Sequence, residues 1–261
     1  MPEPATPAVA WRVVKDGVMV VTLQRPQANA LGLPIIAGLQ AALDEAERRG
    51  DIKVIVVGSG IPGFFAAGAD IKHMSSVDAE SFTAYGEALR AALDRLAADT
   101  WITLAAVDGL ALGGGLELAM ACHLRVAGAE ARLGLPEVRL GLIPGAGGTQ
   151  RLPRLVGRGR ALDIMLTARQ VCAEEALTMG LIDRLVPAGT ALEAALGLAD
   201  ELLAMSLPAL QAVVRTVDAA FGLPASAGFA FEVAQEQALF EGGEAKEGIA
   251  AFLQKRPPKF A

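Results

Sequence analysis

The chain has 261 residues, of which 53% are hydrophobic and 20% charged, so it encodes a folded protein rather than a disordered segment. Its formal net charge of -6 at pH 7 disfavours nucleic acid as the main partner, because phosphate binding depends on Lys and Arg. The two cysteines, Cys122 and Cys172, lack metal-ligand spacing and indicate core thiols in a reducing compartment.

Strand and helix patterns alternate from the N-terminus onward. Two β-rich runs flank Asp16-Gly17, a dipeptide typical of hairpins. Residues 33–50 space their apolar side chains at helical intervals, and Gly50 suits the C-terminal end of that helix. The apolar run at 53–58 predicts a buried strand.

A second amphipathic helix is predicted near residues 78–98, followed by a strand at 101–109. The apolar face of this helix carries Phe82, Tyr85, Leu89, Leu93 and Leu96. Because strands separated by helices pair in parallel through crossover connections, the sequence predicts an α/β fold.

The run LALGGGLELAMACHL, residues 110–124, predicts a buried helix behind a glycine-rich turn, because apolar side chains cover every face of it. Glu117 is the one carboxylate in this run. A second carboxylate, Glu137, directly follows Pro136, which disfavours helix at Leu135 and predicts an exit from a strand into a loop. From about residue 190 the pattern is almost wholly helical, which predicts an extension that covers the core or joins subunits.

Two glycine-rich motifs do not support a nucleotide site, and we interpret the first of them, GSGIPG, as a plain turn between a strand and a loop. GSGIPG at 58–63 matches the glycine pattern of a dinucleotide-binding turn, but the residues after it do not open a helix, as such a site requires. GAGGTQ at 145–150 lacks the Lys-Ser/Thr pair of a phosphate-binding loop. The two histidines have no nucleophile motif beside them, so we interpret His123 as a packed or surface residue and His73 as a loop residue.

Glu117 and Glu137, framed by glycines, are the strongest candidates for chemistry. Burial raises the pKa of a carboxylate toward neutrality, and two such groups can divide the roles of taking and giving a proton. The alternative is structural, with Glu117 satisfied by a hydrogen bond and Glu137 solvated. The glycine turn and the small-residue loop at 65–71 favour chemistry, because free backbone N–H groups there can stabilise an oxyanion. These features predict proton chemistry beside a carbonyl group.

Four long motifs, in order, carry a family resemblance. They are FAAGADIK, ALGGGLELAMACHLRVA, LGLPEVRLGLIPGAGGTQRLPRLVG and AEEALTMGLIDRLVP. From the RPQANAL segment to the C-terminal KEGIAAFLQKRPPKF, the chain resembles the enoyl-CoA hydratase/isomerase, or crotonase, superfamily, and it is similar also to the hydratase half of multifunctional β-oxidation proteins. The resemblance implies a spiral of ββα units with C-terminal helices that build trimers, commonly paired into hexamers.

The resemblance also implies a role for each site residue. The amides of Ala69 and Gly114 would form the oxyanion hole for the thioester carbonyl. Glu117 would activate water for attack at C3, and Glu137 would exchange a proton at C2. The residues implied to hold the coenzyme A thioester are Ala28, Ala66, Gly68, Ala69, Asp70, Ile71, Lys72, Gly113, Gly114 and Pro136. No metal and no cofactor is implied, because the coenzyme A thioester is itself the substrate.

Hydration of a trans-2-enoyl-CoA to a 3-hydroxyacyl-CoA, by syn addition of water, is the first hypothesis because both glutamates are present. A Δ3-Δ2 isomerase, which needs chiefly the Glu137 position, and a hydratase of branched or cyclic enoyl-CoAs are alternatives. A non-catalytic acyl-CoA-binding protein would have lost the carboxylate pair. An RNA-binding relative would need a basic surface, for which the nearest candidate is Arg151, Arg154, Arg158 and Arg160. We interpret these arginines as a solvated helix rim or a subunit contact and expect no nucleic-acid partner.

The expected organisation is a spiral core over residues 1–200 and a helical trimerisation or lid region over 201–261, in a homotrimer or homohexamer. The N-terminal MPEPATPAVAW lacks the basic and apolar regions of a signal peptide, and no run of 18 apolar residues occurs. We therefore expect a cytoplasmic protein without a membrane partner.

Overall fold

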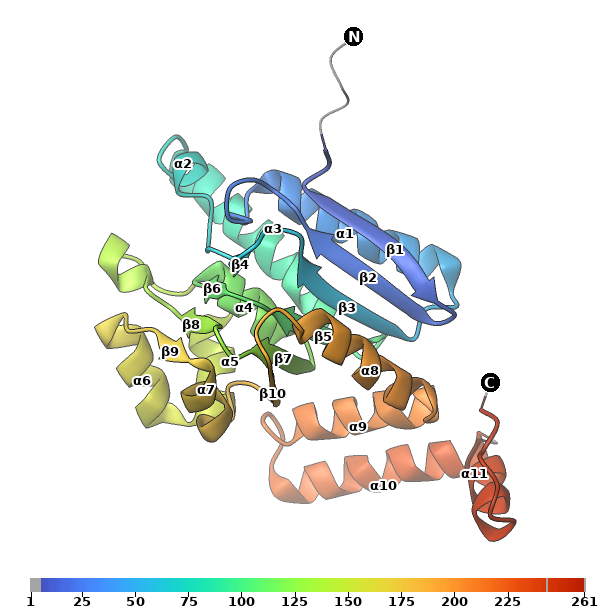
Figure 1. Ribbon diagram of the computed structural model, residues 1–261. Coiled ribbons are helices and arrows are strands. Elements are labelled where there is room, and N and C mark those ends of the chain that lie inside the picture. Colours follow the sequence, from blue (N-terminus) through green and yellow to red (C-terminus); the bar gives the residue numbers. More distant parts are fainter. Residues whose placement is uncertain (1–5, 243, 261) are drawn as a thin grey trace.

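The computed structural model describes residues 6–242 and 244–260 and contains two β-sheets surrounded by helices (Figure 1). The larger sheet has the strand order β1 (Val9–Lys15), β2 (Val18–Leu23), β3 (Val54–Ser59), β5 (Ile102–Val107), β7 (Leu124–Gly128) and β10 (Arg184–Val186). The smaller sheet has the order β4 (Phe64–Ala66), β6 (Leu110–Leu112), β8 (Arg132–Gly134) and β9 (Val171–Cys172). The helices are α1 (Leu33–Arg49), α2 (Ile71–Met74), α3 (Ala79–Ala97), α4 (Gly114–Ala121), the 3-10 turn η1 (Glu137–Leu140), α5 (Gly148–Val156), α6 (Arg158–Thr167), α7 (Ala173–Met179), α8 (Ala191–Leu203), α9 (Leu207–Ala219), α10 (Ala225–Glu241) and α11 (Glu244–Leu253).

Successive strands enter the two sheets in turn. β3, β5 and β7 lie in the larger sheet, and each is followed by a strand of the smaller sheet, β4, β6 or β8, before the chain turns into a helix. The pairs from β2 to β10 in the larger sheet are parallel, whereas β1–β2 and β8–β9 are antiparallel. Because β4, β6 and β8 run in parallel, their C-terminal ends meet at one edge of the smaller sheet. This repetition confirms the spiral of ββα units.

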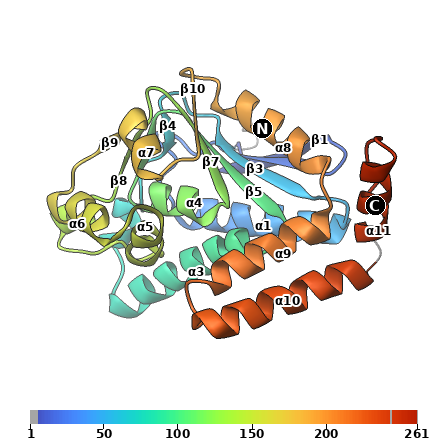
Figure 2. The ribbon, with the colours of Figure 1, turned by 90° about the horizontal axis from the view of Figure 1, so that it is seen from below.

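Alternate residues of the larger sheet face different helices. In β3, Val54 and Val56 pack in the apolar cluster that includes α8, whereas Ile55 and Val57 pack in the cluster that includes α1, α3 and α4. The two views show α8 on one side of this sheet and α1, α3 and α4 on the other (Figures 1 and 2). A sheet covered on both faces needs strands without polar alternation, which explains the continuous apolar run predicted at 53–58.

The predicted elements of the first half are present with small shifts of their ends. The β1–β2 hairpin turns at Asp16-Gly17, and Gly50 ends α1 in the left-handed conformation at φ 70°. Phe82 was wrongly assigned to the buried face of α3, since it is 38% exposed while Tyr85 is 5% exposed. The buried face of α3 therefore begins one turn later than the sequence pattern predicted.

The C-terminal helices lie beyond α8 in Figure 1, where α9 packs on the apolar cluster of the larger sheet and α10 and α11 lie farther out. They confirm the predicted helical extension, and this region exposes large apolar side chains, among them Val213, Phe229, Phe240 and Phe252 in the helices and Phe221 in the turn after α9. By length and composition, no single described helix qualifies to cross a membrane, and only the sharply bent pair α8 and α9, at 108°, qualifies when taken together. The division of the chain at 200/201 stays a prediction and falls within α8, which packs on the larger sheet.

Candidate active site

Glu117 lies in the first turn of α4, a helix in which every residue is buried. The side chain is 3% exposed, and its Oε1 accepts hydrogen bonds from the backbone N–H groups of Ala146, at 2.8 Å, and Gly148, at 2.7 Å. Burial raises the pKa of Glu117, while the two amides and the Arg151 guanidinium oppose the rise. Burial therefore disfavours the ionised form of Glu117, and the two amides and Arg151 offset part of that penalty.

The two amides that hold Glu117 come from the loop between η1 and α5. Gly148 is the first residue of α5, and a Cβ there would lie 3.0 Å from Glu117 Oε1 and 2.6 Å from the Pro144 side chain. A residue with a side chain would therefore crowd the hydrogen bond to Glu117. The GAGGTQ motif forms this loop and the first turn of α5, and sequence reasoning missed its contact with Glu117.

Glu137 begins η1, three residues after the end of β8 at Gly134, where the sequence predicted an exit from a strand. Its Oε2 is buried and has no hydrogen-bond partner among the described residues. Burial raises the pKa of Glu137 to about 7, and the negative charge of Glu117 adds to the rise. The backbone N–H of Glu137 itself opposes the rise, but Oε2 has no partner among the described residues, so Glu137 is the member of the pair suited to carry a proton.

Two glycine turns pack against each other beside these carboxylates. Gly68 and Gly113 both have positive φ, at 90° and 53°, and a Cβ on Gly113 would lie 3.5 Å from Gly68 Cα and 2.8 Å from Glu137 Oε1. A Cβ on Gly114 would lie 3.6 Å from the backbone nitrogen of Ala69. Within the described residues, neither the Ala69 nor the Gly114 N–H donates a hydrogen bond. The structure thus brings together the two amides predicted to form the oxyanion hole.

Asn29 holds the segment that leads into the Gly68 turn. Its role was not predicted from the sequence. Asn29 is fully buried, has φ 54°, and donates from Nδ2 to Ser59 Oγ at 2.8 Å and to the Phe65 carbonyl at 2.9 Å. Its Oδ1 accepts from the Arg25 N–H at 2.8 Å. Asn tolerates the left-handed conformation better than most residues, so this position suits Asn for its backbone as well as for its amide.

Two contacts hold the C-terminal end of the Gly68 turn, at Asp70. One is with Tyr85 of α3, and the other is the ion pair between Arg25 and Asp70. Tyr85 donates from its hydroxyl to the Leu31 carbonyl at 2.6 Å and accepts from the Asp70 N–H at 3.3 Å. Burial by itself would raise the pKa of Asp70, but the Arg25 guanidinium, 2.5 Å away, and the His73 N–H lower it. These contacts fix the turn at both ends without using the Ala69 N–H.

Replacing Gly115 by alanine should destabilise the fold. An added Cβ would lie 2.0 Å from the Ala66 carbonyl oxygen, a backbone atom that cannot move aside cheaply. We expect the free energy of unfolding to fall by about 3 kcal/mol or more. Urea unfolding followed by circular dichroism at fixed protein concentration measures the change.

The matched control for this substitution is Gly86→Ala, in the interior of α3, where nothing lies within 4 Å of an added Cβ. Alanine there should stabilise the protein by up to about 1 kcal/mol, because it favours helix more than glycine does. Equal midpoints for the two variants would contradict the close packing of α4 on β4.

The chain as a whole is similar to known proteins. Residues 14–261 match the family model described as Enoyl-CoA hydratase/isomerase. The chain belongs to this family. It is 41% identical to a probable enoyl-CoA hydratase, echA8, of Mycobacterium bovis over 245 residues, which cover 93% of this chain and 94% of that protein.

Other members of the hydratase/isomerase family extend the comparison. The chain is 45% identical over 210 residues to the peroxisomal fatty acid beta-oxidation multifunctional protein AIM1 of Arabidopsis thaliana, a match that covers 80% of this chain and 29% of that protein. The crystal structure of an enoyl-CoA hydratase from Bacillus anthracis superposes with a TM-score of 0.92 at 31% identity, covering 97% of this chain and 98% of that one. The fold of the described residues is therefore the fold of this family.

The remaining residues predicted from the family resemblance surround the glycine turns. Ala66 ends β4 and is fully buried, and the Ala28 carbonyl accepts a hydrogen bond from the Ala67 N–H at 2.9 Å. Pro136 is half-buried, Ile71 is 49% exposed and Lys72 is exposed. The predicted loop 66–71 thus starts on a strand and ends on α2, and its exposed part lies at Ile71 and Lys72.

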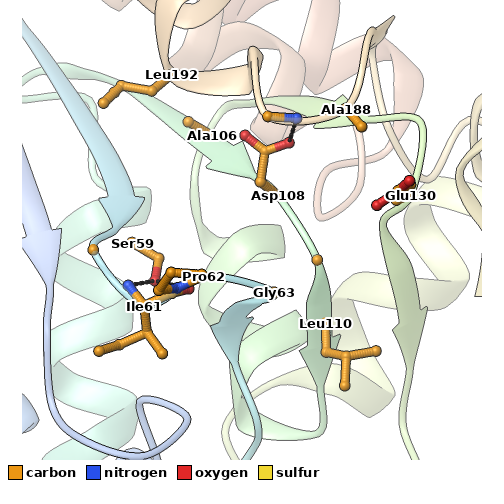
Figure 3. Close-up of a pocket in the computed structure, with 13 residues that line it drawn as sticks. Ser59, Ile61, Pro62, Gly63, Ala106, Asp108, Leu110, Glu130, Ala188 and Leu192 are labelled. Carbon is orange, nitrogen blue, oxygen red and sulfur yellow. Dashed lines mark hydrogen bonds between the residues drawn. The ribbon is translucent and has the colours of Figure 1, made fainter.

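The GSGIPG turn leads into β4 rather than a helix, so its interpretation as a plain turn is confirmed. It borders a cavity of about 500 Å³ that lies away from Glu117 and Glu137. Figure 3 shows this cavity, in which Asp108 accepts hydrogen bonds from the N–H groups of Gly189, at 2.9 Å, and Ala191, at 3.1 Å. Among residues 6–242 and 244–260, no group of three or more His, Cys, Asp and Glu side chains is placed to hold a metal ion.

Proposed function

We propose that the protein hydrates trans-2-enoyl-CoA thioesters to 3-hydroxyacyl-CoA products. The observation that carries the proposal is the unequal pair of carboxylates, with Glu117 held by two amides and Glu137 left with an unpartnered buried oxygen. Hydration needs one group that removes a proton from water and one that delivers a proton to carbon. A protein that only bound acyl-CoA would have no use for this difference in environment.

In the proposed reaction, the Glu117 carboxylate takes a proton from water, and the water oxygen forms a bond to C3 of the substrate. The electron pair of the double bond moves toward the thioester, whose oxygen gains negative charge. The amides of Ala69 and Gly114 stabilise that charge, a contribution that typically amounts to about 10² to 10³ in rate for one donor. Glu137 then delivers its proton to C2 on the same face, which completes syn addition.

No cofactor enters these steps, because the coenzyme A thioester itself supplies the electron-withdrawing group. We propose that the turn from Ala66 to Ile71, with Ala28 beside it, holds the coenzyme A portion, and that Lys72 meets a phosphate. The similarity to a protein named for fatty acid beta-oxidation favours a place in acyl-CoA breakdown. The exposed apolar side chains of α9, α10 and α11 favour assembly into a homotrimer or homohexamer. A cytoplasmic location stays a prediction from the sequence.

The test is the loss of absorbance of the conjugated thioester when the protein is mixed with crotonyl-CoA, followed by identification of 3-hydroxybutyryl-CoA as the product. We expect hydration with crotonyl-CoA or with longer trans-2-enoyl-CoAs, tested in a series of up to about sixteen carbons, because each added methylene changes binding in an apolar pocket. A gain of the same absorbance from a trans-3-enoyl-CoA, with no hydration of any trans-2 substrate, would refute the hydratase proposal in favour of an isomerase.

A further inference from the structure

Arg151 differs from the other arginines of its cluster. The sequence interpretation treated Arg151, Arg154, Arg158 and Arg160 alike, as a solvated rim or subunit contact, but the Arg151 side chain is only 20% exposed while the other three residues are exposed. We propose that Arg151 is a positioning residue that holds the loop amides onto Glu117. The expected change in kcat rests on the proposed hydratase function. The claim that Arg151 holds the loop rests on the contacts alone.

The Arg151 guanidinium acts on the same peptide segment that binds Glu117. Its Nη1 donates to the Ala146 carbonyl oxygen at 3.0 Å, and the Ala146 N–H in turn donates to Glu117 Oε1 at 2.8 Å. Gly147, between the two donor residues, has φ 111°, and a Cβ there would lie 2.2 Å from Arg151 Nη1. The loop therefore packs directly on the guanidinium, and its turn is shaped to fit that group.

Asp94 binds the second terminal nitrogen of the guanidinium, Nη2. Arg151 Nη2 lies 2.7 Å from Asp94 Oδ1, so the side chain of α5 is tied to α3, fifty-seven residues earlier in the chain. A planar guanidinium can serve two acceptors at once in fixed directions, which an ammonium group cannot do. Arg154, one turn later on α5, instead has a single hydrogen bond to the described part of the chain, which it donates to the Gln150 carbonyl of its own helix at 2.7 Å. The contrast separates a clamp on the Glu117 loop from an ordinary surface arginine.

Electrostatics supply a second effect of the same contact. Three charged or titratable groups are linked to Glu117: the Arg151 guanidinium from α5 lowers the pKa of Glu117, and the Glu117 charge in turn raises the pKa of Glu137 from η1 and of Tyr85 from α3. Arg151 is the only cation in this set, and it lowers the pKa of Glu117 against the effect of burial. Removing its charge should therefore make the carboxylate harder to ionise.

The experiment compares Arg151→Gln, Arg151→Lys and Asp94→Asn with Arg154→Gln, the matched control. For Arg151→Gln we expect kcat with crotonyl-CoA to fall about 10- to 100-fold with KM little changed, because the base is misplaced rather than the substrate lost. The acid limb of its kcat/KM profile should move to higher pH. Arg151→Lys keeps the charge, so its acid limb should match the native protein while kcat stays reduced. Asp94→Asn changes an exposed side chain, and we expect a smaller fall in kcat without a fold defect.

Amide hydrogen exchange over residues 144–148 is measured in parallel, because it needs no substrate. Exchange at Ala146 and Gly148 should quicken in Arg151→Gln and Asp94→Asn and stay native in Arg154→Gln. The inference is overturned if Arg151→Gln keeps the native acid limb and native exchange in this loop, or if exchange rises evenly over the whole core with kcat unchanged. A native protein that hydrates no enoyl-CoA would refute the proposed function instead, and the exchange data would still decide whether Arg151 holds the loop.

Discussion

Replacing Glu117 by glutamine lowers kcat for enoyl-CoA hydration by about 10² to 10⁴-fold, because the group that takes the proton from water is lost. The fold should survive, since a glutamine Oε1 can still accept from the Ala146 and Gly148 amides that hold the native side chain. The measurement is the rate of absorbance loss with crotonyl-CoA at saturating substrate, together with a urea unfolding curve for the same sample.

The matched control for this substitution is Glu87→Gln, an exposed glutamate on α3, which should keep native kcat. A Glu117→Gln protein that retained more than about a tenth of native kcat would mean that another group activates the water. An unfolded Glu117→Gln protein would contradict the claim that the amide contacts suffice to hold this side chain.

Replacing Glu137 by glutamine removes the proton donor and should lower kcat by about 10² to 10⁴-fold as well. The substitution also has a signature in pH dependence. The pKa of Glu137 is about 7, so the carboxyl group is mostly protonated below that pH and mostly ionised above it. As a proton donor it works in its protonated form, so native kcat/KM should fall as pH rises through about 7.

The Glu137→Gln profile should lose this alkaline limb, because a glutamine side chain does not titrate. Glu130→Gln, on the turn between β7 and β8, serves as the control and should keep both the rate and the limb. If the alkaline limb near pH 7 persisted in Glu137→Gln, a different group would be the donor. If the native protein gained activity above pH 7, Glu137 would act as a base in the rate-limiting step.

The sequence predicted four strands of the larger sheet, β1, β2, β3 and β5, and the helices α1 and α3, because those elements are long enough to carry a period, whereas it did not predict β7 or β10. Residues 53–58 and the apolar spacing of 33–50 each repeat their pattern over a whole element. The strands of the smaller sheet are two or three residues long, so no periodicity marks β4, β6 or β8. The spiral therefore came from the family resemblance and not from the pattern of apolar residues.

In the site, too, the sequence could predict a distinctive side chain but not the backbone contacts that hold it. A carboxylate in an apolar helix stands out in a sequence, so Glu117 could be singled out, and the glycines before it pointed to free amides. The amides that hold Glu117 come from Ala146 and Gly148, which have no side-chain signature and lie about thirty residues away. Arg151 could not be told from Arg154 by spacing, because its partner Asp94 is on another helix.

The position of the two free amides has a consequence for how the site can change. Ala69 and Gly114 each follow a strand of the parallel pair β4 and β6, just where the strands part. Neighbouring strands lie about 4.8 Å apart and are joined by a ladder of N–H and carbonyl groups. In the proposed complex, the thioester oxygen accepts hydrogen bonds from the Ala69 and Gly114 amides, beyond the point where the two segments bond to each other. The donors are then tied to the ends of two paired strands, because Ala69 lies three residues after β4 and Gly114 two residues after β6. Side-chain substitutions can reshape the walls around the substrate, but the spacing of the donors changes only if the two strands shift relative to each other.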